Sequence, residues 1–163
     1  MDLFIGIVGI AAFIGVAILW QKGTSALGKK ANQTVFMRAS HRQGQELVSQ
    51  QLMSHVDASR DEVRKAILAT VQVAPQVPAV IADAYLIEAT DTYILYGFGN
   101  KFRQSFRGMV RIIESTNGKA TVVWDIVNWT EGDGIVGGQS VMKRLITDIS
   151  TALRSIDPNA QLR

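Results

Sequence analysis

The sequence predicts an α+β protein in which one N-terminal transmembrane helix precedes a small domain, an antiparallel sheet packed on a long C-terminal helix. Residues 3–20 are uncharged and apolar, and residues 84–129 are rich in β-branched and aromatic side chains. Residues 139–156 repeat apolar side chains at helical spacing. The expected divisions are an anchor, a basic juxtamembrane linker and a domain, at residues 1–21, 22–45 and 46–163.

The N-terminal run has the length of a membrane span. As a helix it covers roughly 27 Å, just enough to cross a bilayer core of about 30 Å. An alternative is a cleaved signal peptide, but that requires a positively charged start, and this chain has aspartate at position 2. The residues predicted to anchor the helix are Leu3, Phe4, Phe13 and the interfacial Trp20.

Basic residues are concentrated directly after this run. Between it and the next acidic residue, Glu46, lie Lys22, Lys29, Lys30, Arg38 and Arg42. Cytoplasmic flanks of membrane spans are enriched in lysine and arginine, so the N-terminus is expected outside and the domain in the cytoplasm of a single-pass cell-membrane protein. The formal net charge of +3 therefore belongs to the linker, and nucleic acid is not an expected partner.

Two features of the N-terminal segment leave alternatives open. Ala11 and Gly15 have the spacing of small residues that lets a second helix approach closely, although such residues are also common in spans generally. The basic linker either attracts anionic lipid headgroups or serves only as a topology signal.

The first half of the domain is expected to combine one strand with helices. Alternating apolar residues predict a half-buried strand at residues 46–56, with Val48 on its inward face. Ser59 and Glu62 then have the spacing of a capping box, which marks a helix start. Pro78 is expected to open a second short helix.

Two β-hairpins are expected next, and the turn of the second sets its register. An Asn-Gly pair usually signals a two-residue loop, but that register places Val110 opposite Asp125. A three-residue loop at residues 116–118, with Gly118 left-handed, instead pairs Val110 with Trp124, and the hydrophobic pattern favours it. Arg103, Arg107 and Arg111 then lie together on the outer, solvated face, near Asp125.

The inward face of this hairpin and the C-terminal helix supply the side chains of an expected ligand cavity. The Trp124 indole N–H needs a partner, and Asn128 is expected on the same face. These groups are either hydrogen-bonded in the core or polar anchors in an apolar pocket. The expected cavity residues are Phe102, Phe106, Val110, Ile112, Val122, Trp124, Ile126, Asn128, Leu145 and Ile149.

A strand, a capped helix, a run of antiparallel strands and a long C-terminal helix resemble the helix-grip order of the START and Bet v 1-like superfamily. The local likeness lies in SHVDASRDEVRKAIL, residues 54–68, which looks like that superfamily's first strand running into its first helix. The resemblance covers residues 46–157 and implies a sheet curled around the terminal helix, with a hydrophobic ligand between them and no catalysis. The strands expected here are fewer than in the full fold, which implies a smaller cavity or none.

No constellation of residues predicts catalysis, a cofactor or a metal site. Gly132, Gly134 and Gly137 match a dinucleotide-binding pattern, but no strand follows the next helix, so a turn or lid is the preferred interpretation. The chain has no cysteine and two histidines. His55 and Asp57 share one face of a strand, yet no nucleophile motif accompanies them.

These observations predict a membrane-anchored, non-enzymatic domain that binds a lipid or quinone-like ligand at the inner leaflet. The alternative is an accessory or scaffolding subunit of a larger membrane protein complex. The expected partners are the bilayer itself and either the apolar ligand or the other subunits.

Overall fold

The computed structural model describes residues 38–115, 117–132 and 135–163. The chain divides into two compact units, residues 1–41 and 42–163. In the described part, no helix is both long and apolar enough to cross a membrane. The predicted span lies outside the described residues, and so do its anchor and helix-partner residues, Leu3, Phe4, Ala11, Phe13, Gly15 and Trp20.

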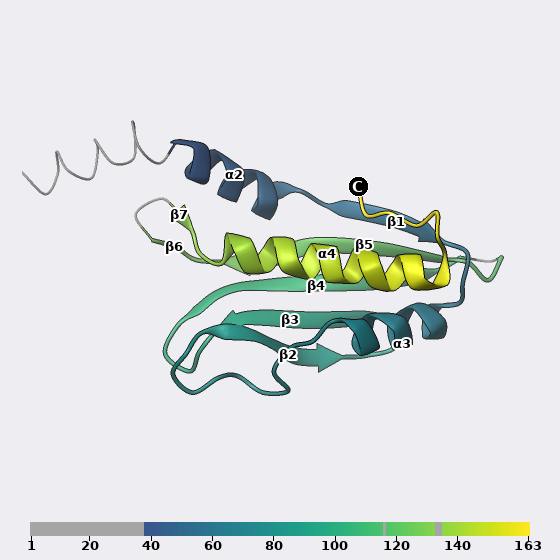
Figure 1. Cartoon of the computed structure of the whole chain (residues 1–163), viewed down its shortest axis with the longest axis horizontal. Helices are drawn as coiled ribbons and strands as arrows, with labels where there is room; N and C mark the ends of the chain where they lie inside the picture. Colours follow the sequence, from purple (N-terminus) through teal and green to yellow (C-terminus); the bar gives the residue numbers. More distant parts are fainter. Residues whose placement is uncertain (1–37, 116, 133–134) are drawn as a thin grey trace, which may run out of the picture. The chain divides into compact units, whose positions relative to one another are not determined.

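The second unit is built on a five-stranded antiparallel sheet with the strand order β1-β5-β4-β3-β2 (Figure 1). Both predicted hairpins are confirmed, since β2 pairs with β3 and β4 pairs with β5. Two further short strands, β6 and β7, pair with each other. The strands are β1 Leu52–Val56, β2 Asp83–Ala89, β3 Tyr93–Gly99, β4 Gln104–Glu114, β5 Ala120–Trp129, β6 Glu131–Gly132 and β7 Ile135–Val136.

The register of β4 and β5 is the one that the hydrophobic pattern predicts. Val110 lies opposite Trp124 and Ile112 lies opposite Val122. Gly118 has a φ of +76°, a left-handed conformation that glycine adopts without a steric penalty. The three-residue loop therefore keeps the apolar side chains of both strands on one face.

Helices α3 (Arg60–Thr70) and α4 (Gln139–Ile156) lie on the same face of the sheet (Figure 1). The bounds of α4 match the predicted helix, and its apolar side is buried against the inward side chains of the strands. From α4, the buried side chains are Met142, Leu145, Ile149, Ala152 and Leu153.

Two sequence predictions are wrong in the first half of the domain. Helix α2 occupies Arg38–Ser49, so the predicted strand begins only at Leu52. Gly44 and Val48 are both buried, and their spacing of four residues fits one face of a helix. The short helix expected at Pro78 is also absent, because residues 76–82 form an irregular loop.

The N-terminus of α3 has the predicted capping box. The Ser59 hydroxyl accepts a hydrogen bond from the Glu62 backbone N–H, and the Glu62 carboxylate accepts one from the Ser59 N–H at 2.9 Å. Hydrogen bonds from Ser59 hold the pKa of Glu62 below its ordinary value of 4.5. The largest effect comes from the Ser59 hydroxyl, which donates to the same carboxylate, and the next from the Ser59 backbone N–H.

This lowered pKa predicts a stability difference that depends on pH. A carboxyl group whose pKa is lowered in the folded state stabilises the protein at pH values above the pKa that the group has in the unfolded state. This stabilisation is lost as the pH falls through the pKa of the group in the folded state. We therefore expect Glu62→Gln to be less stable than the wild type at pH 7, with the difference shrinking towards pH 3. Urea unfolding at several pH values measures it, and a difference independent of pH would contradict the assignment.

Both edges of the sheet are partly covered by other segments. On β1, Met53 exchanges two backbone hydrogen bonds with Arg163, at 3.0 and 3.2 Å. On β2, the backbone of Ala74 bonds to Ala84 and Leu86. Each edge strand thus presents fewer unpaired backbone groups to its surroundings.

Candidate functional site

The predicted cavity residues fall into two groups. Most of them are buried in one apolar layer between the sheet and α4, with exposed fractions of 7% or less. Their alternation along β4 and β5 and their spacing along α4 bring them together as expected. This group comprises Phe106, Val110, Ile112, Val122, Trp124, Ile126, Leu145 and Ile149.

Phe102 does not belong to this layer, because its side chain is 85% exposed. Strand β4 begins only at Gln104, and Phe102 lies in the loop before it. The side-chain oxygen of Asn100 accepts hydrogen bonds from the backbone N–H groups of Phe102 and Arg103, at 3.0 and 2.9 Å. This turn ends the strand alternation on which the prediction depended.

Asn128 is also outside the layer, and a β-bulge is the reason. Arg107 pairs with Asn128 while the next residue, Gly108, pairs with Ile126, so Val127 is an extra residue in β5. One extra residue reverses the face of every later side chain in the strand. Asn128 therefore lies beside Arg107 on the outer face, where it is exposed.

Two hydrogen-bonding groups inside the apolar layer lack partners. The indole nitrogen of Trp124 on β5 and the hydroxyl of Tyr96 on β3 are buried, and neither has a hydrogen-bond partner among the described residues. Both side chains are 1% exposed. Tyr96 lies opposite Gly108, and the Trp124 ring packs over that same glycine, so the two side chains approach one site of the layer. Buried polar groups are normally paired, so two orphans in one apolar layer require an explanation.

Tyr96 was not among the predicted site residues, although the sequence holds a signal for it. It alternates with Ile94 in the predicted strand, which places both side chains on the inward face. Burial, and to a smaller extent the negative charge of Asp148 on α4, raises the pKa of Tyr96 far above its ordinary value of 10.0. The hydroxyl therefore remains protonated at neutral pH and is available as a donor.

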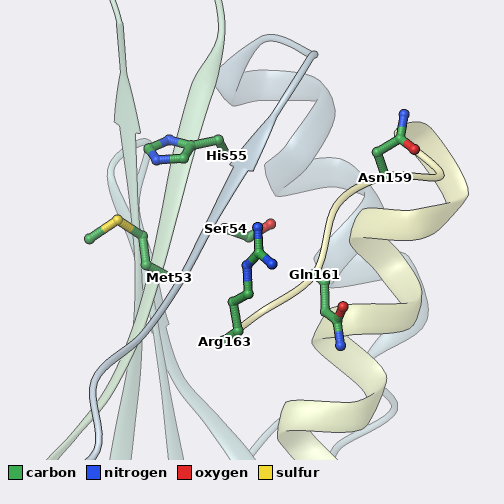
Figure 2. A pocket seen from close by; sticks show the side chains of 6 residues that line it. All are labelled: Met53, Ser54, His55, Asn159, Gln161 and Arg163. Atoms are coloured by element: carbon green, nitrogen blue, oxygen red, sulfur yellow. The ribbon is translucent and has the colours of Figure 1, made fainter.

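A separate, polar pocket of about 370 Å³ lies beside β1. The Ser54 hydroxyl is buried there and has no partner among the residues that the structure describes. The pocket contains none of the predicted cavity residues, so it is distinct from the apolar layer. Figure 2 shows the side chains that line it: Met53, Ser54 and His55 of β1, and Asn159, Gln161 and Arg163 of the C-terminal segment.

The histidine considered for catalysis makes other contacts. The Nδ1 atom of His55 lies 3.0 Å from the hydroxyl oxygen of Thr121. Asp57 forms an ion pair with Lys119, at 3.1 Å, so it does not orient His55. Among the described residues, no cluster of three or more histidine or acidic side chains could hold a metal ion.

The described residues of the glycine motif and of the arginine row lie in several different elements. Gly132 belongs to β6 of the small hairpin, and Gly134 lies outside the described residues. Arg111 lies near Asp125 as expected and forms an ion pair with it, at 3.0 Å, on the outer face of the sheet. Arg107 donates to the side chain of Gln104 at 2.7 Å.

The comparisons with known proteins do not assign a family. No protein-family model matches the chain, and no curated protein matches it. A solved structure of a protein from Nitrosospira multiformis, determined by a structural genomics consortium, matches with 13% identity and a TM-score of 0.36. The match covers 64% of this chain and 96% of the other. At this level of similarity the resemblance to the START and Bet v 1-like superfamily stays a prediction.

Proposed function

We propose that this protein is a membrane-anchored, non-enzymatic domain that binds an apolar ligand at the inner leaflet. The ligand is a lipid or quinone-like molecule that carries a hydrogen-bond acceptor, and it is held between the sheet and α4. The observation that supports this most directly is the pair of unpartnered donors, Trp124 Nε1 and the Tyr96 hydroxyl, within an otherwise apolar layer. The helix-grip resemblance of the sequence adds to it.

The chemistry of the two donors suggests the kind of ligand. An indole N–H can only donate a hydrogen bond, and a tyrosine hydroxyl that stays protonated donates as well. Together they suit a carbonyl or ester oxygen on a molecule whose remaining surface is hydrocarbon. A ligand of this kind replaces the unpaired donors with hydrogen bonds, each worth about 0.5–1.5 kcal/mol net.

Replacing Tyr96 by phenylalanine separates this proposal from a purely structural role. Without ligand, the variant should be more stable than the wild type by about 1 kcal/mol, because a buried hydroxyl without a partner is costly. With ligand, affinity should fall by about two- to tenfold, the loss of one hydrogen bond. Thermal unfolding and mass spectrometry of lipids extracted from the purified full-length protein measure the two effects.

The matched control is Tyr93→Phe, which removes a hydroxyl from the same strand at a position between buried and exposed. It should leave ligand retention unchanged. Absence of any co-purifying apolar molecule from membrane extracts, together with a loss of stability in Tyr96→Phe, would refute the proposal. That result would mean that the hydroxyl makes a structural hydrogen bond.

A second candidate function is an accessory subunit of a membrane protein complex, and one feature favours it. Helices α3 and α4 both lie on one face of the sheet (Figure 1). Exposed apolar side chains lie on the other face. Among them, Met53 is 41% exposed, Ile113 54% and Val127 45%. Co-purification of stoichiometric protein partners in place of an apolar ligand would support this function instead.

A further inference from the structure

Three large apolar side chains project from two loops that meet at one end of the sheet. Val80, Ile81 and Phe102 are 70%, 83% and 85% exposed. We call these three residues the apolar tip. Isolated exposed apolar residues are common on protein surfaces, but a cluster at loop tips marks a site of interaction.

The two loops are fixed to each other by hydrogen bonds. The backbone N–H of Lys101 donates to the carbonyl of Pro78 at 2.9 Å, and the side-chain amide of Asn100 donates to the carbonyl of Val80. Asn100 also accepts the two backbone bonds that shape the turn around Phe102. These hydrogen bonds therefore hold the two loops that carry the apolar tip in a defined conformation.

The charges beside the apolar tip are positive. Lys101 and Arg103 flank Phe102, and within the described ranges neither forms an ion pair. Two acidic residues also lie at this end: Asp83 at the start of β2, whose carboxylate is 3.7 Å from the Arg144 guanidinium, and Glu131 of β6, whose carboxylate accepts a hydrogen bond from Gln45. Apolar side chains between lysine and arginine fit an anionic membrane surface, where hydrocarbon and negative headgroups lie within a few ångströms of each other.

The chain enters the domain at this same end. Gly44 of α2 packs against Val136 and Gln139, and Gln45 donates to the carboxylate of Glu131 at 2.6 Å. The β6–β7 hairpin, the start of α4 and the β3–β4 loop that carries Phe102 all lie at one end of the sheet (Figure 1). The predicted span and most of the basic linker precede residue 42 in the sequence, so the tether joins the domain at this end.

We propose that the apolar tip is a docking surface for an anionic bilayer. Val80, Ile81 and Phe102 insert into the boundary between headgroups and acyl chains, while Lys101 and Arg103 contact the headgroups. This inference rests on the membrane anchoring in the proposed function and is independent of the ligand. Docking turns a domain on a tether into one with a fixed face towards the membrane.

Depth-dependent fluorescence quenching of the whole chain in vesicles tests whether the apolar tip inserts into the bilayer. The chain has no cysteine, so a single introduced cysteine carries the only label. The probe is a fluorophore at Ile81→Cys, in vesicles of phosphatidylcholine and phosphatidylserine that contain a nitroxide lipid with its spin label just below the headgroups. Quenching should be several-fold stronger than for the same fluorophore at Asn117→Cys, an exposed position in the loop that joins the far end of β4 to β5.

Two further variants assign the effect to the proposed contacts. Phe102→Ser in the Ile81→Cys background should reduce the quenching to near the Asn117 value. Replacing Lys101 and Arg103 with serine should reduce it in phosphatidylserine vesicles and much less in pure phosphatidylcholine vesicles, because the charges act on anionic lipid.

Equal quenching at positions 81 and 117, or quenching that survives Phe102→Ser, would overturn the inference. So would a label at position 81 that is shielded from aqueous iodide but not reached by the nitroxide, because a protein would then cover the tip. None of these results depends on a co-purifying ligand. Failure of membrane docking can therefore be distinguished from failure of the proposed ligand binding.

Discussion

Replacing Gly108 with valine is expected to lower the free energy of unfolding by about 3 kcal/mol or more. Gly108 lies on the inward face of β4, where the Trp124 indole packs directly over it. A Cβ atom at this position would lie 2.7 Å from Trp124 Cζ2 and closer still to Cη2. Trp124 is 1% exposed and enclosed in the core, so its ring cannot move aside without displacing the sheet or α4.

A double-mutant cycle shows whether this overlap is the cause. In a Trp124→Leu background the ring is gone, so Gly108→Val should cost much less than in the wild type. Urea unfolding of the four proteins gives the coupling energy, which should be at least about 1 kcal/mol for residues in such contact. Equal costs in both backgrounds would mean that the backbone freedom of glycine, and not space for the indole, is what Gly108 provides.

Gly138→Ala should cost about 2–4 kcal/mol of folding free energy, for two reasons that add. Gly138 caps the N-terminus of α4 with a φ of +78°, where a Cβ atom is disfavoured. Its ideal Cβ would also lie 2.7 Å from Cε1 of Phe98 and 3.0 Å from Cε1 of Phe106. These two rings pack together with their centroids 5.6 Å apart, which leaves little room for adjustment.

Gly118 provides the matched control for this substitution. Its φ of +76° is nearly the same, but among the described residues, its two chain neighbours aside, no atom lies within 4 Å of an ideal Cβ there. Gly118→Ala should therefore carry only the backbone penalty, about 1–2 kcal/mol. Thermal unfolding of both variants separates the two contributions, and equal losses would show that the contact with the phenylalanine rings is unimportant.

Much of the fold is predictable because its strongest patterns are long and locally consistent. Helix α4 repeats apolar residues over several turns, and the β4–β5 hairpin has one register that keeps every large apolar residue inside. Helix α2 could not be predicted in the same way, because in residues 41–49, where burial is described, its buried residues are Gly44 and Val48. A glycine carries no hydrophobic signal, although here it permits close packing against Val136.

The residues of the candidate site also divide into those that the sequence predicts and those that it does not. Trp124 could be placed from strand alternation, whereas Asn128 could not, because the bulge at Val127 leaves no mark in the pattern of apolar residues. Phe102 looks like a strand residue until the Asn100 turn is known. Its proximity to Val80 depends on hydrogen bonds between distant loops, which no local pattern reveals.

The pairing of Met53 with Arg163 limits how the sheets of two copies of this domain can associate. An open edge strand is a template on which a second copy can add its own strand, and confinement to a surface makes such encounters frequent. The C-terminal segment occupies that position on β1, and Ala74 occupies part of the corresponding position on β2. Crowded copies of this domain therefore have less open edge through which to merge their sheets into a continuous ribbon.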